Sequence, residues 1–148
     1  KNCQRNRFKI FVRINFMELQ VGVKILLKNK EGKYLVVCRS AEKYPKVGRQ
    51  WELAGGRINP GSALAENLKR EVKEETGLEI SGDPKLIAAQ DIIKPHKHIV
   101  RLTYIGRADG EVRLSDEHTD HKWLSLEEIS ALKPLDEYLK EVLAKFNL

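Results

Sequence analysis

The 148-residue sequence has few cysteines and no long apolar run. A membrane-spanning helix needs about 20 consecutive apolar residues, and the stretch at residues 8–16 is interrupted by Lys9 and Arg13. The same charges disfavour the continuous apolar segment of a signal peptide. Cys3 and Cys38 can form at most one disulfide, and Cys38 lies in an apolar run typical of a small buried thiol. We therefore predict a protein of the reducing cytoplasm that has no membrane partner.

Long basic blocks, repeats and low-complexity tracts are also missing, although the formal net charge is +6. The lysines are scattered and are not interleaved with aromatic residues, so the sequence does not indicate a nucleic-acid-binding surface. Its basic balance fits either a solvated surface without a partner or a small anionic substrate. The length fits one domain. A homodimer is left open.

Strand and helix patterns are mixed along the chain. Alternating apolar residues predict a strand at residues 8–16, so residues 1–16 are either an N-terminal extension or an extra strand before a single domain at 17–148. Further strands are expected at residues 19–27, 33–39, 51–53, 86–93, 98–107 and 123–124, and helices at 62–76, 126–132 and 135–146. This mixture predicts an α/β (α+β) fold, with an α/β/α sandwich around a mixed β-sheet.

The helix expected at residues 62–76 has the clearest boundaries. Ser62 suits an N-cap, and Gly77 suits the glycine that ends a helix. The predicted buried stripe consists of Leu64, Leu68 and Val72. The opposite face contains Asn67, Arg70, Glu71, Glu74 and Glu75.

Three carboxylates of that face, Glu71, Glu74 and Glu75, lie within one helical turn. Taken alone, such a pattern is typical of a solvated acidic face. Carboxylate clusters are also the ligands that Mg²⁺ prefers, commonly beside substrate phosphates. The preceding loop contains Gly55 and Gly61, which would let the backbone approach a ligand closely. The loop and the helix together favour a metal-dependent site.

The segment from Gly56 to Leu78 resembles the Nudix box. That family pattern is glycine, five residues, glutamate, seven residues, then arginine-glutamate-hydrophobic-any-glutamate-glutamate-any-glycine-hydrophobic. Every fixed position matches except Ser62, which stands where the family has its first glutamate. The resemblance implies a Nudix-type pyrophosphohydrolase that uses Mg²⁺ (or Mn²⁺) to cut a phosphoanhydride bond in a nucleoside diphosphate linked to another moiety. ADP-ribose and nucleoside triphosphates are the expected small-molecule substrates. The alternative, raised by Ser62, is a catalytically impaired nucleotide-binding regulator of the same fold.

The resemblance also implies roles for particular residues. The implied metal ligands are Glu71, Glu74, Glu75 and the carbonyl of Gly55. The implied catalytic residues are Arg70, which would orient the glutamates, Glu74 and Glu117. Glu117 precedes Trp123 by six residues, in a region where many Nudix proteins supply a glutamate or base from a loop. Arg39, at the end of the second expected strand, matches a position where relatives often place a substrate-contacting arginine.

Two histidine-containing segments are ambiguous. His118 and His121 lie among carboxylates at residues 116–121, but their spacing fits no specific zinc pattern, so a solvent-facing polar loop is expected there. His96 and His98 are flanked by lysines and belong either to a phosphate-contacting segment or to a plain basic loop.

Overall fold

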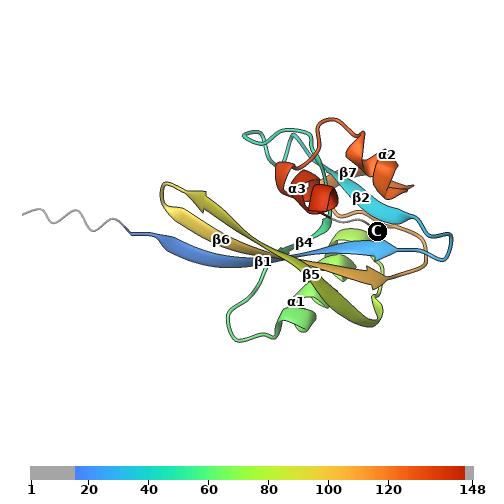
Figure 1. The fold of residues 1–148 in the computed structure, drawn as a ribbon, viewed down its shortest axis with the longest axis horizontal. Helices are drawn as coiled ribbons and strands as arrows, with labels where there is room; N and C mark the ends of the chain where they lie inside the picture. Colours follow the sequence, from blue (N-terminus) through green and yellow to red (C-terminus); the bar gives the residue numbers. More distant parts are fainter. Residues whose placement is uncertain (1–15, 146–148) are drawn as a thin grey trace, which may run out of the picture.

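A computed structural model describes residues 16–145 (Figure 1). The strand predicted at residues 8–16 therefore falls almost wholly outside the described residues, and the division at residue 16 stays a prediction. Within the described range, no helix is long and apolar enough to cross a membrane.

The described residues form seven strands and three helices. In chain order they are β1 (Glu18–Lys28), β2 (Tyr34–Arg39), β3 (Trp51–Glu52), β4 (Ala54–Arg57), α1 (Leu64–Thr76), β5 (Ser81–Lys94), β6 (Lys97–Arg107), β7 (His118–Leu124), α2 (Leu126–Ser130) and α3 (Glu137–Lys145).

All seven strands belong to one sheet, in which β1 is central. One edge of β1 pairs in parallel with β6 along its whole length, and β6 pairs with β5 in antiparallel fashion. The other edge of β1 pairs with β4 and, at its end, with β2, which also holds β3 and β7. The parallel pair among antiparallel ones confirms the predicted mixed sheet.

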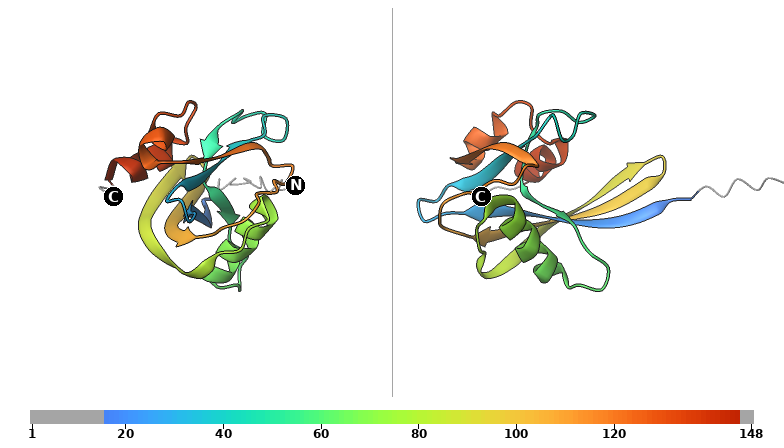
Figure 2. Two further views of the ribbon diagram at one scale, coloured as in Figure 1. Left: turned by 90° about the vertical axis from the view of Figure 1, so that its right-hand side faces the viewer. Right: turned by 180° about the vertical axis from the view of Figure 1, so that it is seen from behind.

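Helices cover both sides of the sheet (Figure 2). Successive residues of a strand point to opposite faces, so Ile25 packs with Leu68 and Val72 of α1. Its neighbour Leu26 packs on the other side with Ile129 of α2 and Leu139 of α3. This alternation explains why the middle of β1 is apolar without interruption except at Lys24.

Two strand predictions are corrected. The single strand expected at residues 51–53 is two strands, because β3 pairs with β2 and β4 pairs with β1, and the chain changes partner at Leu53. The polar loop expected at residues 116–121 is wrong for its second half, since β7 begins at His118 and pairs with β2.

The start of α1 is also corrected. The N-cap is Ala63 rather than Ser62, and Leu64 is 38% exposed, so the buried stripe begins at Leu68. Ser62 instead donates its N–H to the Asn59 carbonyl in a turn, which keeps it outside the helix. The predicted end is confirmed, because Gly77 adopts a positive φ of 73° that favours glycine.

Asn67 explains this start. Its side chain is 1% exposed, and its amide donates to the carbonyls of Ser62 (3.1 Å) and Ala63 (2.7 Å). Its side-chain oxygen accepts from the Asn59 N–H at 2.8 Å and from the Arg70 guanidinium at 3.2 Å. Asn67 thus ties the glycine-rich loop to the helix.

Replacing Asn67 with alanine should lower the free energy of unfolding by about 1–3 kcal/mol, because the loop and the start of α1 lose several hydrogen bonds to a buried side chain. Urea denaturation would measure the loss. Lys69→Ala, an exposed change two residues away, should stay within about 0.5 kcal/mol of wild type. Equal stabilities of the two variants would contradict this role for Asn67.

Candidate active site

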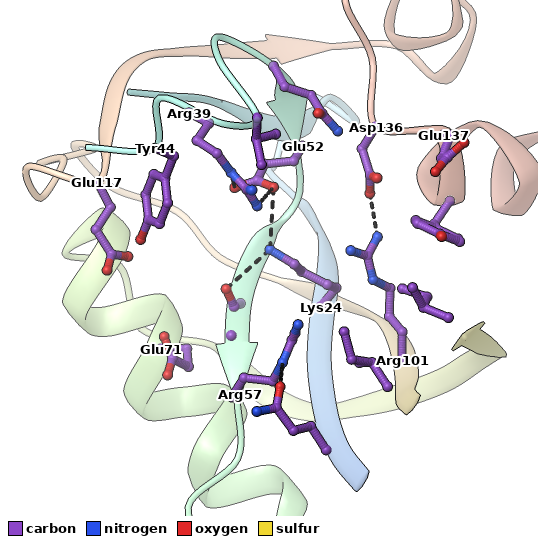
Figure 3. A pocket seen from close by; sticks show the side chains of 18 of the residues that line it. Lys24, Arg39, Tyr44, Glu52, Arg57, Glu71, Arg101, Glu117, Asp136 and Glu137 are labelled. Atoms are coloured by element: carbon purple, nitrogen blue, oxygen red, sulfur yellow. Dashed lines mark hydrogen bonds and ion pairs between the residues drawn. The ribbon is translucent and has the colours of Figure 1, made fainter. Parts of the chain in front are cut away.

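A cavity of about 670 Å³ lies against α1 and the central strands (Figure 3). This volume is within the usual range of small-molecule sites, about 300–1,000 Å³. Residues of α1 and of strands β1 to β6 line it, together with the start of β7 and the segment that leads into α3. Residues far apart in the sequence therefore face one space.

Glu75 is the most deeply buried carboxylate of α1. It is 5% exposed, and one of its oxygens accepts a hydrogen bond from the Gly55 N–H at 2.8 Å. Burial raises the pKa of Glu75 to about 7, although the Lys24 ammonium and the Gly55 hydrogen bond act in the opposite direction. No ion pair to Glu75 forms within residues 16–145. A carboxylate in this state suits a divalent cation, which would supply the missing positive charge.

Glu71 reaches the same cavity beside Gly56. A Cβ at position 56 would lie 2.7 Å from the Glu71 carboxylate, so any larger residue there would displace this carboxylate. Arg70 donates to Glu71 at 2.9 Å and to Glu74 at 3.3 Å. Glu74 has a 58% exposed side chain and does not line the cavity. The fold thus brings Glu71 and Glu75 to the cavity and leaves Glu74 on the outer side, next to Arg70.

The Gly55 carbonyl, expected to bind metal, lies next to a cation in this structure. Lys24 donates to it at 3.2 Å and to the Leu53 carbonyl at 3.0 Å. A carbonyl oxygen has two lone pairs, so this contact leaves one for another partner. At Gly55 the φ of 135° and the 2.0 Å approach of a Cβ to the Val23 carbonyl both require glycine.

Glu52 was not singled out by the sequence, yet it lies at the centre of a buried charged cluster. Arg39 donates to its two oxygens at 3.2 and 2.5 Å, His118 contacts it through Nε2 at 3.0 Å, and Lys24 lies 3.8 Å away. Burial alone would favour protonation of Glu52. The positive charges of Lys24 and Arg39 and the His118 hydrogen bond outweigh it and hold the pKa of Glu52 well below its usual range.

Arg39 lines the cavity as predicted for a substrate-contacting residue. Its guanidinium is paired with Glu52 and lies 5.1 Å from the centre of the Tyr44 ring. Burial and the neighbouring Glu117 raise the pKa of Tyr44 to about 12, which keeps its hydroxyl protonated. Figure 3 shows this hydroxyl pointing toward Glu117. The substrate contact of Arg39 stays a prediction.

Glu117 and His118 meet Glu75 although more than forty residues separate them from α1. One potential ligand atom from each of the three side chains lies within 4.8 Å of the other two. The Ser40 N–H donates to the Glu117 carbonyl at 2.9 Å and fixes this segment beside β2. His121, the other histidine of the segment, is not in the group.

Cations line the cavity as well. Arg57, Lys94 and Lys97 face it, whereas His98 instead pairs with Asp91 at 2.7 Å. Arg57 forms no ion pair within the described residues, and burial, reinforced by the nearby Arg101, lowers its pKa. The lysines of the ambiguous basic segment therefore belong to the cavity wall.

A buried ion pair closes the wall near α3. Arg101 donates to Asp136, and its guanidinium lies 5.0 Å from the centre of the Tyr138 ring. These residues, with Lys24, Tyr44, Glu52 and Arg57, are among the cavity residues that sequence reasoning missed. The available signal was a charged residue inside an otherwise apolar strand, as at Lys24, which becomes informative only if the position is buried.

Comparison with known proteins places these features in a wider context. The model of the NUDIX domain family matches residues 18–146. The nucleoside triphosphatase NudI of Escherichia coli O17:K52:H18 is 30% identical over 115 residues, covering 70% of this chain and 80% of NudI. The MutT protein from Methanosarcina mazei Go1 superposes with a TM-score of 0.77 at 29% identity, covering 86% of this chain and 92% of its own. The MutT NUDIX hydrolase from Burkholderia pseudomallei gives a TM-score of 0.73 at 23% identity, covering 86% and 97%.

Proposed function

Because this chain belongs to the Nudix family and is a hydrolase of phosphoanhydride bonds, we propose that its substrates are nucleoside triphosphates, which it cleaves to a monophosphate and pyrophosphate. The observation that carries this proposal is that acidic and basic side chains line one cavity. The carboxylates are Glu71, Glu75 and Glu117, and the cations include Arg57 and Lys94. A polyphosphate with a divalent cation requires both. The relative NudI, named a nucleoside triphosphatase, supports the same substrate class.

Nudix hydrolases need a divalent metal ion, and the donor set here fits one. Glu71, Glu75 and Glu117 would hold Mg²⁺ or Mn²⁺, with the Gly55 carbonyl as an additional ligand. When bound, the ion neutralises phosphate charge and lowers the pKa of a coordinated water. The rise in the pKa of Glu75 is the local sign of this fit, because a buried carboxylate lacks a counter-charge there.

Other side chains would accept the proton, orient the carboxylates and bind the substrate. Glu117 would hold the ion through one carboxylate oxygen and accept the proton of the attacking water with the other, while the protonated Tyr44 hydroxyl beside it holds the carboxylate in place. Arg70 would keep Glu71 and Glu74 oriented through the contacts it already makes. Arg57 and Lys94 would bind the phosphates, and Arg39, which also lines the cavity, would contact the substrate.

Ser62 has no direct place in this scheme. It is exposed in the loop before α1 and does not line the cavity. Its presence therefore leaves the Glu71 and Glu75 side of the site intact.

A substrate panel tests the proposal. The common ribonucleoside and deoxyribonucleoside triphosphates and ADP-ribose would each be incubated with Mg²⁺ or Mn²⁺, and the products separated by anion-exchange chromatography. We expect monophosphate and pyrophosphate from at least one triphosphate. Faster cleavage of ADP-ribose than of every triphosphate would overturn the substrate class. Nucleotide binding without any hydrolysis would support the impaired regulator instead.

We expect hydrolysis to increase from pH 6 to above pH 8 at saturating metal. The reason is that the attacking water must lose a proton. Glu75, with a pKa raised to about 7 in the metal-free protein, must lose its proton to bind a cation, so the affinity for metal should rise over the same range. The pH dependence of kcat/KM would measure this, with the metal retitrated at each pH. A maximum on the acid side of pH 6 would contradict the mechanism.

A further inference from the structure

The imidazole of His118 is buried and contacts the Glu52 carboxylate. Its side chain is 2% exposed, and Nε2 lies 3.0 Å from the Glu52 carboxylate, which Arg39 and Lys24 fix from other directions. A carboxylate paired with two cations accepts hydrogen bonds and does not donate them. Nε2 therefore carries a proton, and in the neutral imidazole the lone pair is on Nδ1.

Nδ1 of His118 has no hydrogen-bond partner among the described residues, although it is buried. Only one other buried side-chain atom in this part of the chain, the Gln90 oxygen, shares that condition. Leaving a buried polar atom unpaired is unfavourable by about 1–3 kcal/mol, so such an atom calls for an explanation.

The side chains around His118 explain its unpaired Nδ1 atom. A ring nitrogen of His118 and one carboxylate oxygen each from Glu75 and Glu117 lie within 4.8 Å of one another. Since Nε2 is engaged by Glu52, Nδ1 is the ring nitrogen whose lone pair is left for a ligand. We propose that His118 Nδ1, Glu75 and Glu117 form a mixed nitrogen and oxygen site for a divalent first-row transition metal ion.

The contact between His118 and Glu52 supports this assignment independently of Glu75 and Glu117. Histidines that bind metal almost always donate their other ring N–H to a carboxylate, a carbonyl or water, which fixes the tautomer and the ring orientation. The Glu52–His118 pair has that arrangement, and sequence spacing could not reveal it because Glu52 lies 66 residues before His118.

The nitrogen ligand changes the expected metal preference. Mg²⁺ favours oxygen ligands, whereas imidazole suits borderline ions such as Co²⁺, Ni²⁺ and Zn²⁺, whose affinities follow a general order above that of Mn²⁺. The inference deepens the proposed function, on which it rests for the roles of Glu75 and Glu117. It predicts that this site discriminates among metals through His118.

Pulsed electron paramagnetic resonance of the protein loaded with Mn²⁺ alone tests ligation directly. A coordinated imidazole nitrogen modulates the Mn²⁺ echo, so wild type should show nitrogen modulation and His118→Gln should not. The matched control is His121→Gln, which removes the other histidine of β7 and should retain the modulation. Wild-type spectra without nitrogen modulation would overturn the proposal, whether or not His118→Gln folds.

Calorimetric titration of metal-stripped protein measures the consequence. Loss of His118 should weaken Ni²⁺ binding at least tenfold, in the range seen when groups supporting a metal site are removed, about 10–100-fold. Mg²⁺ binding should change less than about twofold because oxygen ligands dominate it. Equal weakening of Ni²⁺ and Mg²⁺ would indicate that His118 only supports the fold, and would count against ligation.

These measurements separate the inference from the proposed function. Nitrogen modulation in a protein that cleaves no triphosphate would leave the metal site standing and overturn the substrate. Triphosphate hydrolysis with Mg²⁺, in a protein whose Mn²⁺ spectra lack nitrogen modulation, would do the reverse.

Discussion

Replacing Glu75 with glutamine is expected to reduce hydrolysis by about three orders of magnitude while the fold is retained. The change preserves size and the acceptor for the Gly55 N–H, but it removes the negative charge from the buried end of the proposed metal site. A bound metal contributes several kcal/mol to the transition state, and a loss of about 4 kcal/mol corresponds to roughly a thousandfold in rate. Steady-state kinetics with the preferred triphosphate would measure the loss.

The same substitution should make the metal-free protein more stable at pH 8. The pKa of Glu75 is raised from 4.5 to about 7, so between these values the folded state binds a proton that the unfolded state has lost. Stability of the metal-free wild type therefore falls as pH increases through this window, by up to about 3 kcal/mol. Glutamine cannot ionise and removes this dependence. Added metal should reverse the order, because it binds folded wild type.

Glu66→Gln is the matched control, since Glu66 is an exposed glutamate in the first turn of the same helix. It should change neither the rate nor the pH dependence of stability appreciably. Near-wild-type hydrolysis by Glu75→Gln would show that the metal is held elsewhere. A metal-free Glu75→Gln protein less stable than wild type at pH 8 would show that burial of the charge is not unfavourable.

Replacing Glu52 with alanine should give the largest loss of stability, about 3–5 kcal/mol, because Lys24 and Arg39 would keep buried charges without their partner. For a domain of this size that is a fall of roughly 10 °C in Tm. The pKa of Glu52 is depressed, so its contribution is present above about pH 4.5 and is lost as the pH falls toward the folded-state pKa. Thermal unfolding between pH 3 and pH 8 would measure both effects.

Two further variants test whether unpaired buried charges cause the loss of stability in Glu52→Ala. Glu128→Ala removes the surface partner of Lys33 and also the carboxylate that accepts the Ser125 N–H at the start of α2. The Glu128 and Lys33 side chains are 53% and 42% exposed, so the change should alter stability by only about 1–2 kcal/mol. The double change of Lys24→Met with Glu52→Gln removes both a buried charge and its main partner, and should recover much of the loss. A Glu52→Ala protein no less stable than Glu128→Ala would contradict the role of this cluster.

Local patterns in the sequence determined most of the secondary structure. Runs rich in apolar residues predicted the strands at 19–27 and 98–107. Helical periodicity and a terminal glycine predicted the helix ending at Gly77. The glycine-rich loop followed by Arg70, Glu71, Glu74 and Glu75 also indicated the family. These features depend only on near neighbours in the chain.

Only the tertiary structure decided how the site is assembled. Ser62 fits an N-cap by residue type, but the buried Asn67 amide holds the loop so that the helix starts after Ala63. The acidic face looked solvated, yet Glu75 is buried because β4 lies against it. Contacts of this kind join residues distant in sequence, where periodicity carries no information.

The proposed metal ligands show the same difference between what the sequence and the tertiary structure determine. The sequence supplied the carboxylates of α1, and it also supplied two histidines near Glu117 without distinguishing between them. Pairing of β7 with β2 brings His118, and not His121, to Glu52 and Glu75. A residue's chemistry is fixed by its type, but its partners are fixed by the register of strands that meet only when the whole sheet has formed.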